Sequence, residues 1–368
     1  MPELRVIDSL AQVEKSTWDR LFPGEIEGYD YLSVAEAAGL EGFRWRYLLV
    51  EEQGRLVAAA PAFLTAYPLE TTLAGAARRV ADGLRRVAPD ALTLRLACIG
   101  SPCTETALLG FDPDVTPPEK PKLLRRIVAG LEQVAARERC GLLGIKDVAE
   151  DDSALWTQAA PDYRAISSLP SASLRIDFPS LDKYLERLSA ATRKDMRRKL
   201  KALSQVRIEV RGNIDDVLDR VMALYRETRA RAEMALEDLT PAYFQGVLQQ
   251  LGGRAFCTIY WQGDDLLAVN LLLQDGDTLL DKFFCMDAER GRPLNLYFLS
   301  WFTNVRLCLE RGLAHYRTGQ AGCENKLRLG SRITRTANHF RHRNALLNGG
   351  LRLVAPLFAA DPIAEQAA

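Results

Sequence analysis

The segment from residue 255 to residue 318 constrains the fold of this chain most strongly. Three apolar, β-like runs follow one another between residues 255 and 286, and the acidic, glycine-containing triplets that separate them are typical of hairpin turns. The amphipathic pattern over 293–311 then predicts a long helix, and a short strand is expected at 314–318. Hairpins followed by a helical connection predict a mixed, mainly antiparallel sheet with helices packed on it.

The first half of the chain repeats this order of elements. Strands are predicted at 4–7, 43–51, 55–64, 92–99 and 142–145, with helices at 10–22, 31–39, 69–87 and 118–139. In the second half, helices at 181–203, 214–232 and from Thr240 onward accompany a strand at 207–210 and a last β-run near 334–343. This order indicates an α/β chain (α+β, mixed sheet) of two domains, 1–165 and 166–368, although two unrelated domains could share the order by chance.

Composition excludes several classes of protein. The 48 basic and 48 acidic residues give a net charge of zero, so no global field attracts DNA and any polyanion site must be a local patch. The chain starts without a secretory signal pattern and has no run of roughly 20 apolar residues. Seven cysteines without a CxxC pair and only three histidines indicate reduced thiols in a cytoplasmic protein, with no metal site expected.

The loop at 287–293 is a candidate phosphate site. It joins the strand ending at Met286 to the helix at 293–311, and a helix N-terminus offers unpaired N–H groups and partial positive charge. Arg290, Gly291 and Arg292 are the candidate contacts in this loop. The polar run at 319–330 would add three further candidate ligands from the neighbouring strand: Gln320, Lys326 and Arg328.

The predicted helix at 181–203 carries a dense basic face. Arg193, Arg197 and Lys201 are four residues apart and line up on one side, with Arg198 beside them. One interpretation is a solvated face neutralised by carboxylates elsewhere. The other is a surface facing the phosphates of a nucleotide, coenzyme or tRNA.

Five motifs together carry a family resemblance. They are Leu188–Lys199, Leu224–Thr228, Thr240–Phe244, Gly263–Ala268 and the closing Gly319–Gly330 segment with its K-x-R-x-G pattern. Their residues and order are similar to those of the Fem-like, BioF2-like branch of the GNAT acyltransferases, over residues 180–345. The resemblance implies two tandem GNAT-like domains, each a mainly antiparallel twisted sheet flanked by helices. The N-terminal copy would be degenerate and the C-terminal copy would hold the site.

The resemblance also implies transfer of an acyl group to an amine. Members of the group take the acyl group from acyl-CoA or, in the peptidoglycan-bridge branch, from aminoacyl-tRNA. This chain departs from both patterns. Its loop supplies one glycine and Pro293 where a pyrophosphate cradle would present backbone N–H groups, and we find no helical-hairpin insertion of the kind that binds tRNA.

Amine acylation needs a base, an oxyanion stabiliser and a group at the departing atom. We predict Lys326 as the phosphate or oxyanion ligand, with Tyr297 reaching the leaving sulfur and Asp281 and Glu324 as acids of the site. Asp281 could instead belong to a structural ion pair with Lys282 as neighbour, and Tyr297 could be a core residue. Cys257, Cys285, Cys308 and Cys323, together with His315, His339, His342 and Asp238, were weaker candidates.

The sequence therefore predicts a cytoplasmic tandem-GNAT N-acyltransferase that uses an acyl-CoA donor. The alternatives are an aminoacyl-tRNA-dependent transferase on the same fold and a non-catalytic GNAT-like binding module. The acceptor would be an amine of a small molecule or of a cell-envelope precursor, and DNA is not expected as a partner. The sequence does not indicate an oligomeric state.

Overall fold

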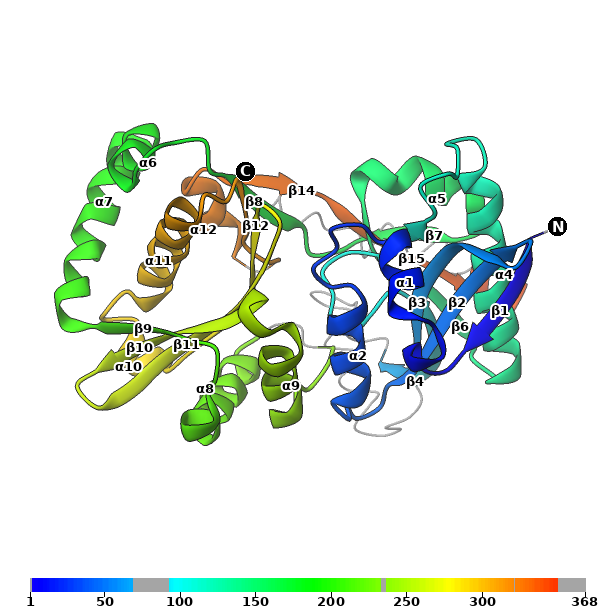
Figure 1. Cartoon of the computed structure of the whole chain (residues 1–368), viewed down its shortest axis with the longest axis horizontal. Coiled ribbons are helices and arrows are strands. Elements are labelled where there is room, and N and C mark those ends of the chain that lie inside the picture. The colour runs from blue at the N-terminus through cyan, green and yellow to red at the C-terminus, as the bar shows by residue number, and fades with distance from the viewer. Residues whose placement is uncertain (1, 69–92, 233–235, 321, 350–368) are drawn as a thin grey trace.

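The computed structural model describes residues 2–68, 93–232, 236–320 and 322–349, which form two sheets side by side (Figure 1). Within these ranges the first sheet has eight strands in the order β1-β2-β3-β4-β6-β15-β7, with β5 paired to β3. The second has seven strands in the order β14-β8-β13-β12-β11-β10-β9. All strand pairs are antiparallel except β4–β6 and β12–β13. The predicted class, two mainly antiparallel sheets flanked by helices, is confirmed.

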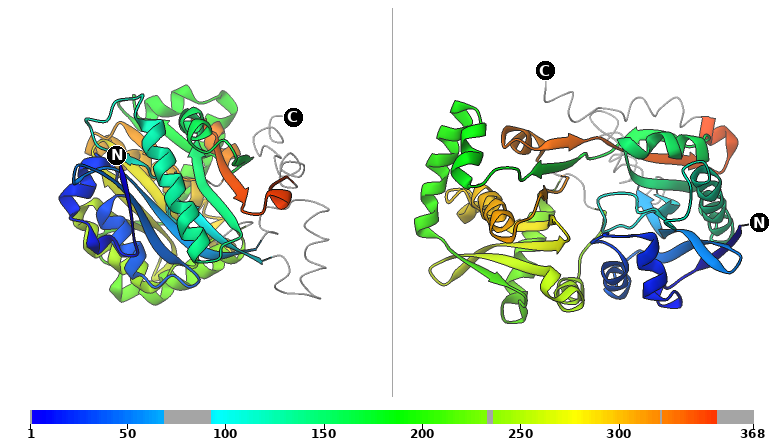
Figure 2. Two further views of the ribbon diagram at one scale, coloured as in Figure 1. Left: turned by 90° about the vertical axis from the view of Figure 1, so that its right-hand side faces the viewer. Right: turned by 45° about the horizontal axis from the view of Figure 1, so that its top comes forward.

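The first sheet and its helices come almost entirely from the first half of the chain. Its strands are β1 (Glu3–Ile7), β2 (Arg44–Glu52), β3 (Arg55–Pro68), β4 (Thr93–Ile99), β5 (Gly110–Phe111), β6 (Leu142–Ala149), β7 (Arg164–Ser167) and β15 (Thr336–His342). Its helices are α1 (Lys15–Leu21), α2 (Tyr29–Ala37), α4 (Lys120–Arg137) and α5 (Ser153–Ala159). The helix predicted at 69–87 lies outside the described residues. Helix α4 covers the outer face of this sheet (Figure 2) with the apolar stripe Leu124, Ile127 and Leu131.

The second sheet follows the predicted order of elements. Its strands are β8 (Ser171–Arg175), β9 (Arg207–Arg211), β10 (Ala255–Gln262), β11 (Asp265–Asp275), β12 (Thr278–Met286), β13 (His315–Arg317) and β14 (Arg332–Thr334). Its helices are α6 (Leu181–Arg187), α7 (Ala190–Leu200), α8 (Leu218–Ala230), α9 (Pro241–Leu251), α10 (Ala288–Gly291), α11 (Leu296–Arg311) and α12 (Cys323–Arg328).

Three helices differ from the sequence prediction for local reasons. The helix predicted at 181–203 is two helices, because Leu188 is extended (ψ 154°) and the Ser189 hydroxyl accepts from the Thr192 N–H to start a new one. The helix predicted at 10–22 is broken by extended Val13, and α1 then begins at Lys15 without a side-chain cap. The long helix begins at Leu296 rather than at 293, because Asn295 adopts a left-handed conformation (φ 56°).

The two sheets are tied together by an exchanged strand and by a shared core. Strand β15, from the C-terminal segment, pairs with β6 and β7 of the first sheet, whereas β14 just before it pairs with β8 of the second. Helices α2 and α9 pack against each other, and the hydroxyl groups of Tyr31 and Tyr243 lie 2.6 Å apart across that contact. The domain boundaries 1–165 and 166–368 remain a prediction. Strand β15 lies in the second range but completes the first sheet.

Candidate functional site

A cavity of about 740 Å³ lies between the two sheets, a volume within the usual range for ligand sites. In each sheet, the cavity lies at the end of the pair of parallel strands. The β4–β6 pairing ends at Ile99 and Ile145, and the β12–β13 pairing ends at Leu280 and Arg317. Residues that follow these four ends line the cavity, so both strand openings face one space.

Asp281 is the first residue of β12 beyond its pairing with β13. Buried residues of the second half of the chain hold its carboxylate in place. Its Oδ2 accepts from the Tyr316 hydroxyl at 2.7 Å and from Asn304 Nδ2 at 3.1 Å. Burial raises the pKa of this carboxyl. Asp281 thus lines the cavity as a positioned carboxylate.

Lys326 projects into the same cavity from α12. The sequence indicated only a polar run here, yet Gly322, with a left-handed conformation, starts a short helix that turns Lys326 inward. The residue is only 4% exposed. Within the described residues its Nζ donates one hydrogen bond, to the Gly319 carbonyl at 2.8 Å. Burial lowers the pKa of Lys326. An ammonium group has three N–H donors, so two remain for a ligand.

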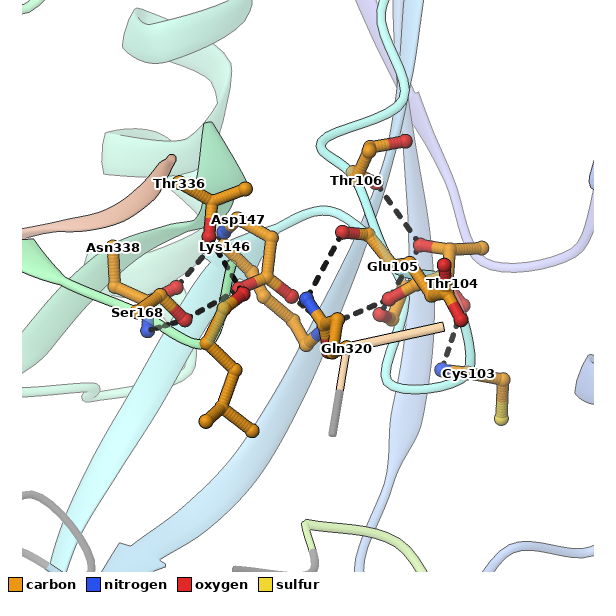
Figure 3. Close-up of polar contacts among 12 residues, drawn as sticks. Cys103, Thr104, Glu105, Thr106, Lys146, Asp147, Ser168, Gln320, Thr336 and Asn338 are labelled. Carbon is orange, nitrogen blue, oxygen red and sulfur yellow. Dashed lines mark hydrogen bonds and ion pairs between the residues drawn. The ribbon is translucent and has the colours of Figure 1, made fainter. Parts of the chain in front are cut away.

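Glu105 meets Lys326 from the other sheet, and sequence reasoning missed it. A Cβ placed on Gly319 would lie 3.4 Å from Glu105 Oε1 and 3.7 Å from Lys326 Nζ, so both groups border the same point. The loop after β4 carries Glu105, and Gln320 Nε2 donates to its backbone carbonyl at 3.2 Å (Figure 3). Burial raises the pKa of Glu105. Its one signal in the sequence is its place just after a buried strand, which many acids share.

Tyr297 lies on the first turn of α11 and also lines the cavity. Its hydroxyl is buried and has no hydrogen-bond partner among the described residues. A Cβ on Gly322 would lie 3.5 Å from it, so the start of α12 packs close to the phenol. A buried hydroxyl normally has a partner, and this one is placed to find it in a ligand.

A second polar cluster lines the cavity on the first sheet (Figure 3). Lys146 Nζ donates to the Thr104 carbonyl at 2.7 Å and contacts Asp147 Oδ2. Asp147 has a left-handed backbone (φ 53°), and its Oδ1 accepts from the Ser168 hydroxyl at 2.6 Å. Asn338 Oδ1 accepts a hydrogen bond from the backbone N–H of Asp147. Three of these interactions therefore hold Asp147 in an unfavourable backbone conformation, which is typical of functional sites.

The predicted phosphate loop lies away from this cavity. Arg290 pairs with Asp265 at 2.7 Å in the β10–β11 turn, Gly291 is buried against Leu296, and none of these residues or Arg292 lines the cavity. The N-terminus of α10 is capped by the carboxylate of Asp287, which accepts from the Arg290 N–H. An anion at this helix end would meet that carboxylate.

The other predicted site residues lie on the outer surface. Glu324 is exposed on α12, outside the cavity lining. Asp195 on α7 pairs with Arg198 at 2.7 Å and with Arg328 at 3.5 Å, so α7 and α12 meet there. Arg193 bonds the Glu186 carbonyl, and Arg197 shares the basic face of α7. The structure therefore brings Asp281, Tyr297, Gln320 and Lys326 together and leaves the predicted arginines apart from them.

The cysteines and histidines give no second site. All seven cysteines are free and buried, and burial raises the pKa of Cys323, which disfavours a thiolate. His315 is half exposed, His339 is buried in β15, and Asp238 pairs with Arg229 at 3.6 Å. Among the described residues, no group of three or more His, Cys, Asp or Glu side chains is placed to hold a metal ion. None of the helices in those ranges is long and apolar enough to cross a membrane.

Lys282 joins the two halves beneath the cavity. Its Nζ lies 2.5 Å from Glu27 Oε1 and contacts the Cys103 carbonyl, while Arg317 lies 3.6 Å from Glu27 Oε2. The side chains of Lys282 and Glu27 are 2% and 0% exposed. A fully buried ion pair across two halves fixes their relative position, because separating it would leave charges without water or partner.

Lys282→Met is therefore expected to lower the free energy of unfolding by about 3–5 kcal/mol, since it leaves Glu27 buried with only the more distant Arg317. Urea unfolding followed by circular dichroism measures it. The double variant Glu27→Gln/Lys282→Met should recover most of the loss, and Lys183→Met, at an exposed ion pair, should change little. Equal losses in Lys282→Met and the double variant would contradict the buried-charge explanation.

Comparison with known proteins agrees with this architecture. Residues 190–326 match the family model described as an acetyltransferase (GNAT) domain. The fold is similar to a crystal structure of FemX, with a TM-score of 0.59 at 14% identity over 95% of this chain and 100% of that one. It is also similar to a tandem GNAT protein from the clavulanic acid biosynthesis pathway, with a TM-score of 0.54 at 13% identity over 94% and 99% of the chains.

A third similar structure is the C-terminal domain of a putative lysylphosphatidylglycerol synthetase from Agrobacterium fabrum. Its TM-score is 0.57 at 11% identity, over 95% of this chain and 96% of that domain. At these identities the likeness establishes the fold, which is the predicted tandem GNAT architecture. A search of curated proteins with the sequence gave no match.

Proposed function

We propose that this chain, whose residues 190–326 match a GNAT-type acetyltransferase domain, is an N-acyltransferase that moves an acyl group from an acyl-CoA-type thioester to an amine. The observation that carries the proposal is the meeting of Glu105 and Lys326 at Gly319 inside the cavity between the sheets. A carboxylate and an ammonium group that border the same point can supply the base and the oxyanion ligand that amine acylation requires.

The reaction can be written with these side chains. Glu105 takes the proton of the bound ammonium group, and the free amine attacks the thioester carbonyl carbon. The carbonyl oxygen becomes an oxyanion, to which Lys326 donates an N–H. The C–S bond then breaks and the amide forms as its nitrogen loses a second proton, which passes to the departing thiolate. Tyr297 is placed to donate its unpaired O–H toward the sulfur.

Two features of the site tune these groups for their tasks. Burial raises the pKa of Glu105, which makes its carboxylate a stronger base toward an ammonium group. Asp281 faces the charge of Lys326 and opposes the effect of burial on its pKa. We assign Asp281 an electrostatic role toward Lys326, because Tyr316 and Asn304 already occupy its Oδ2.

An aminoacyl-tRNA donor is the second candidate. The support for it is that the Asp287 carboxylate caps α10 where a pyrophosphate would be expected, while α7 presents a basic face to solvent. Arg193, Arg197 and Arg198 would then contact tRNA phosphates, with Arg328 beside them. The same cavity and the same Glu105 and Lys326 would form a peptide bond instead of an amide with a simple acyl group.

A donor comparison tests the proposal. The full-length chain is incubated with a panel of primary amines and either acetyl- to octanoyl-CoA or a mixture of aminoacyl-tRNAs, and mass spectrometry detects the acylated amine. We expect transfer from acyl-CoA, lowered by about 10²–10³-fold in Lys326→Met. Transfer from aminoacyl-tRNA alone would establish the second candidate. If neither donor reacts or shifts the thermal midpoint, the chain is a non-catalytic GNAT-like module.

A further inference from the structure

We propose that the acceptor amine carries an apolar alkyl or aryl body, which binds against the first sheet; this rests on the proposed N-acyltransferase function. One end of the cavity, here called the apolar arm, is lined by Phe43, Phe63, Leu96, Cys98, Leu236 and Phe340. These side chains surround space that is continuous with the site of Lys326 and Glu105. A ligand that filled both parts would need an apolar portion.

Strand register places the wall of the apolar arm on one face of the first sheet. Phe63 on β3 pairs with Cys98 on β4, Cys98 with Gly144 on β6, and Gly144 with Phe340 on β15. Side chains at paired positions point to the same face. Gly144 keeps this row flat, because a Cβ there would lie 3.0 Å from Cys98 Sγ and 3.3 Å from the Phe340 ring.

The second half of the chain supplies the opposite wall. Phe283 lies two residues after Asp281 on β12, and both line the cavity together with Tyr225 of α8. Leu236, in the segment between α8 and α9, packs against the same apolar cluster as Phe63 and Phe340. The apolar arm therefore has walls from both halves and is continuous with the polar site.

The charged groups around the apolar arm suit an amine better than an acyl chain. Glu237 directly follows Leu236, lines the cavity and has a pKa raised by burial, and Glu105 borders the same point as Lys326. One carboxylate therefore adjoins a residue of the arm, and another adjoins the oxyanion ligand. An amine with an apolar body would bring its ammonium group to these carboxylates, whereas an acyl chain in the apolar arm would bring no charge to them.

Binding of a homologous amine series tests the inference without requiring turnover. Isothermal titration of the full chain with n-propyl- to n-octylamine, phenylalkylamines and glucosamine should give affinities that rise by up to about fourfold per methylene. Glucosamine should bind weakest, and the alkyl and phenyl series show which apolar body fits. Leu236→Glu, or Thr65→Trp on the lining of the arm, should flatten the series. Val210→Glu, at a residue 49% exposed on β9, should not.

The outcomes separate this inference from the proposed function. Affinities independent of chain length, or a slope unchanged in Leu236→Glu and Thr65→Trp, would overturn the inference even if acyl transfer to polar amines is observed. A dependence on acyl-CoA chain length instead of amine length would also overturn it. If apolar amines bind with the expected slope and no donor reacts, the inference holds and the proposed function fails. The slope in the unsubstituted chain decides the question should a variant not fold.

Discussion

Lys326→Met is expected to lower kcat/KM by about 10²–10³-fold, the usual cost of removing one oxyanion donor. Methionine has a similar length and no N–H, so the cavity keeps its shape while the oxyanion loses its ligand. Steady-state kinetics with the donor and amine that react in the donor comparison measure the effect. A residual activity above one tenth of the original would show that Lys326 does not hold the oxyanion.

Stability should not fall with this change. The pKa of Lys326 is lower in the folded chain than in the unfolded one, so below that pKa its charge disfavours folding, and this cost disappears as the pH rises past the unfolded value. Lys326→Met removes the cost at neutral pH. We therefore expect an unfolding free energy equal to or above that of the unsubstituted chain, which separates a catalytic loss from a folding defect.

The pH dependence gives Lys326 a signature of its own. The residue must be protonated to stabilise an oxyanion, so activity should fall as the pH rises through its lowered pKa, below the range of an ordinary lysine. Lys326→Arg keeps the charge at every accessible pH. This variant should retain part of the activity and should no longer lose it as the pH rises. If the loss of activity at high pH were unchanged, another group would cause it.

Glu105→Gln is expected to lower kcat/KM by about 10²–10⁴-fold, the range for loss of a general base. Glutamine keeps the side-chain volume and the backbone carbonyl that binds Gln320, so the loss should reflect proton transfer. The raised pKa of Glu105 predicts an acid limb at a higher pH than an ordinary glutamate gives, because activity is lost as pH falls through that pKa. The limb should vanish in Glu105→Gln.

Glu25→Gln is the matched control for Glu105→Gln. Glu25 belongs to the same buried group of charges and burial also raises its pKa, but it does not line the cavity. Its substitution should leave the acid limb in place. Glu105 lies 3.9 Å from Arg317 of that group. Should Glu25→Gln and Glu105→Gln reduce the rate alike, Glu105 would act only as a structural member of this ion cluster and not as the base.

The sequence predicted most elements of the second sheet because their patterns are local. The three hairpin strands and α9 at Thr240-Pro241 were each indicated by alternation, turn residues or a cap. Local chemistry also explains where the predicted helices differ from the structure. The helix break at Leu188-Ser189 and the start of α11 after Asn295 depend on single backbone angles that periodicity does not record. α12 is too short for a periodic signal.

The candidate site residues stay a prediction, and the structure shows only which of them lie together. Lys326, Tyr297, Asp281 and Gln320 were named from one continuous segment, and the structure places them in one cavity. The loop arginines were predicted from the general affinity of helix N-termini for phosphate, but the Asp287 carboxylate caps α10 and Arg290 pairs with Asp265. These are side-chain interactions that a count of glycines and arginines in the loop does not reveal.

The sequence by itself determined the order of strands and helices, the two-part α/β organisation and the polar segment that carries Lys326. These follow from local propensity and periodicity, which act over a few residues. Only the tertiary structure decided that Glu105 and Lys326 border the same point and that β15 completes the first sheet. It also decided that Phe63 and Phe340 of the first sheet line the same cavity as Asp281 of the second. Those relations join residues far apart in the chain, and they arise because two sheets pack with their parallel strand openings toward each other.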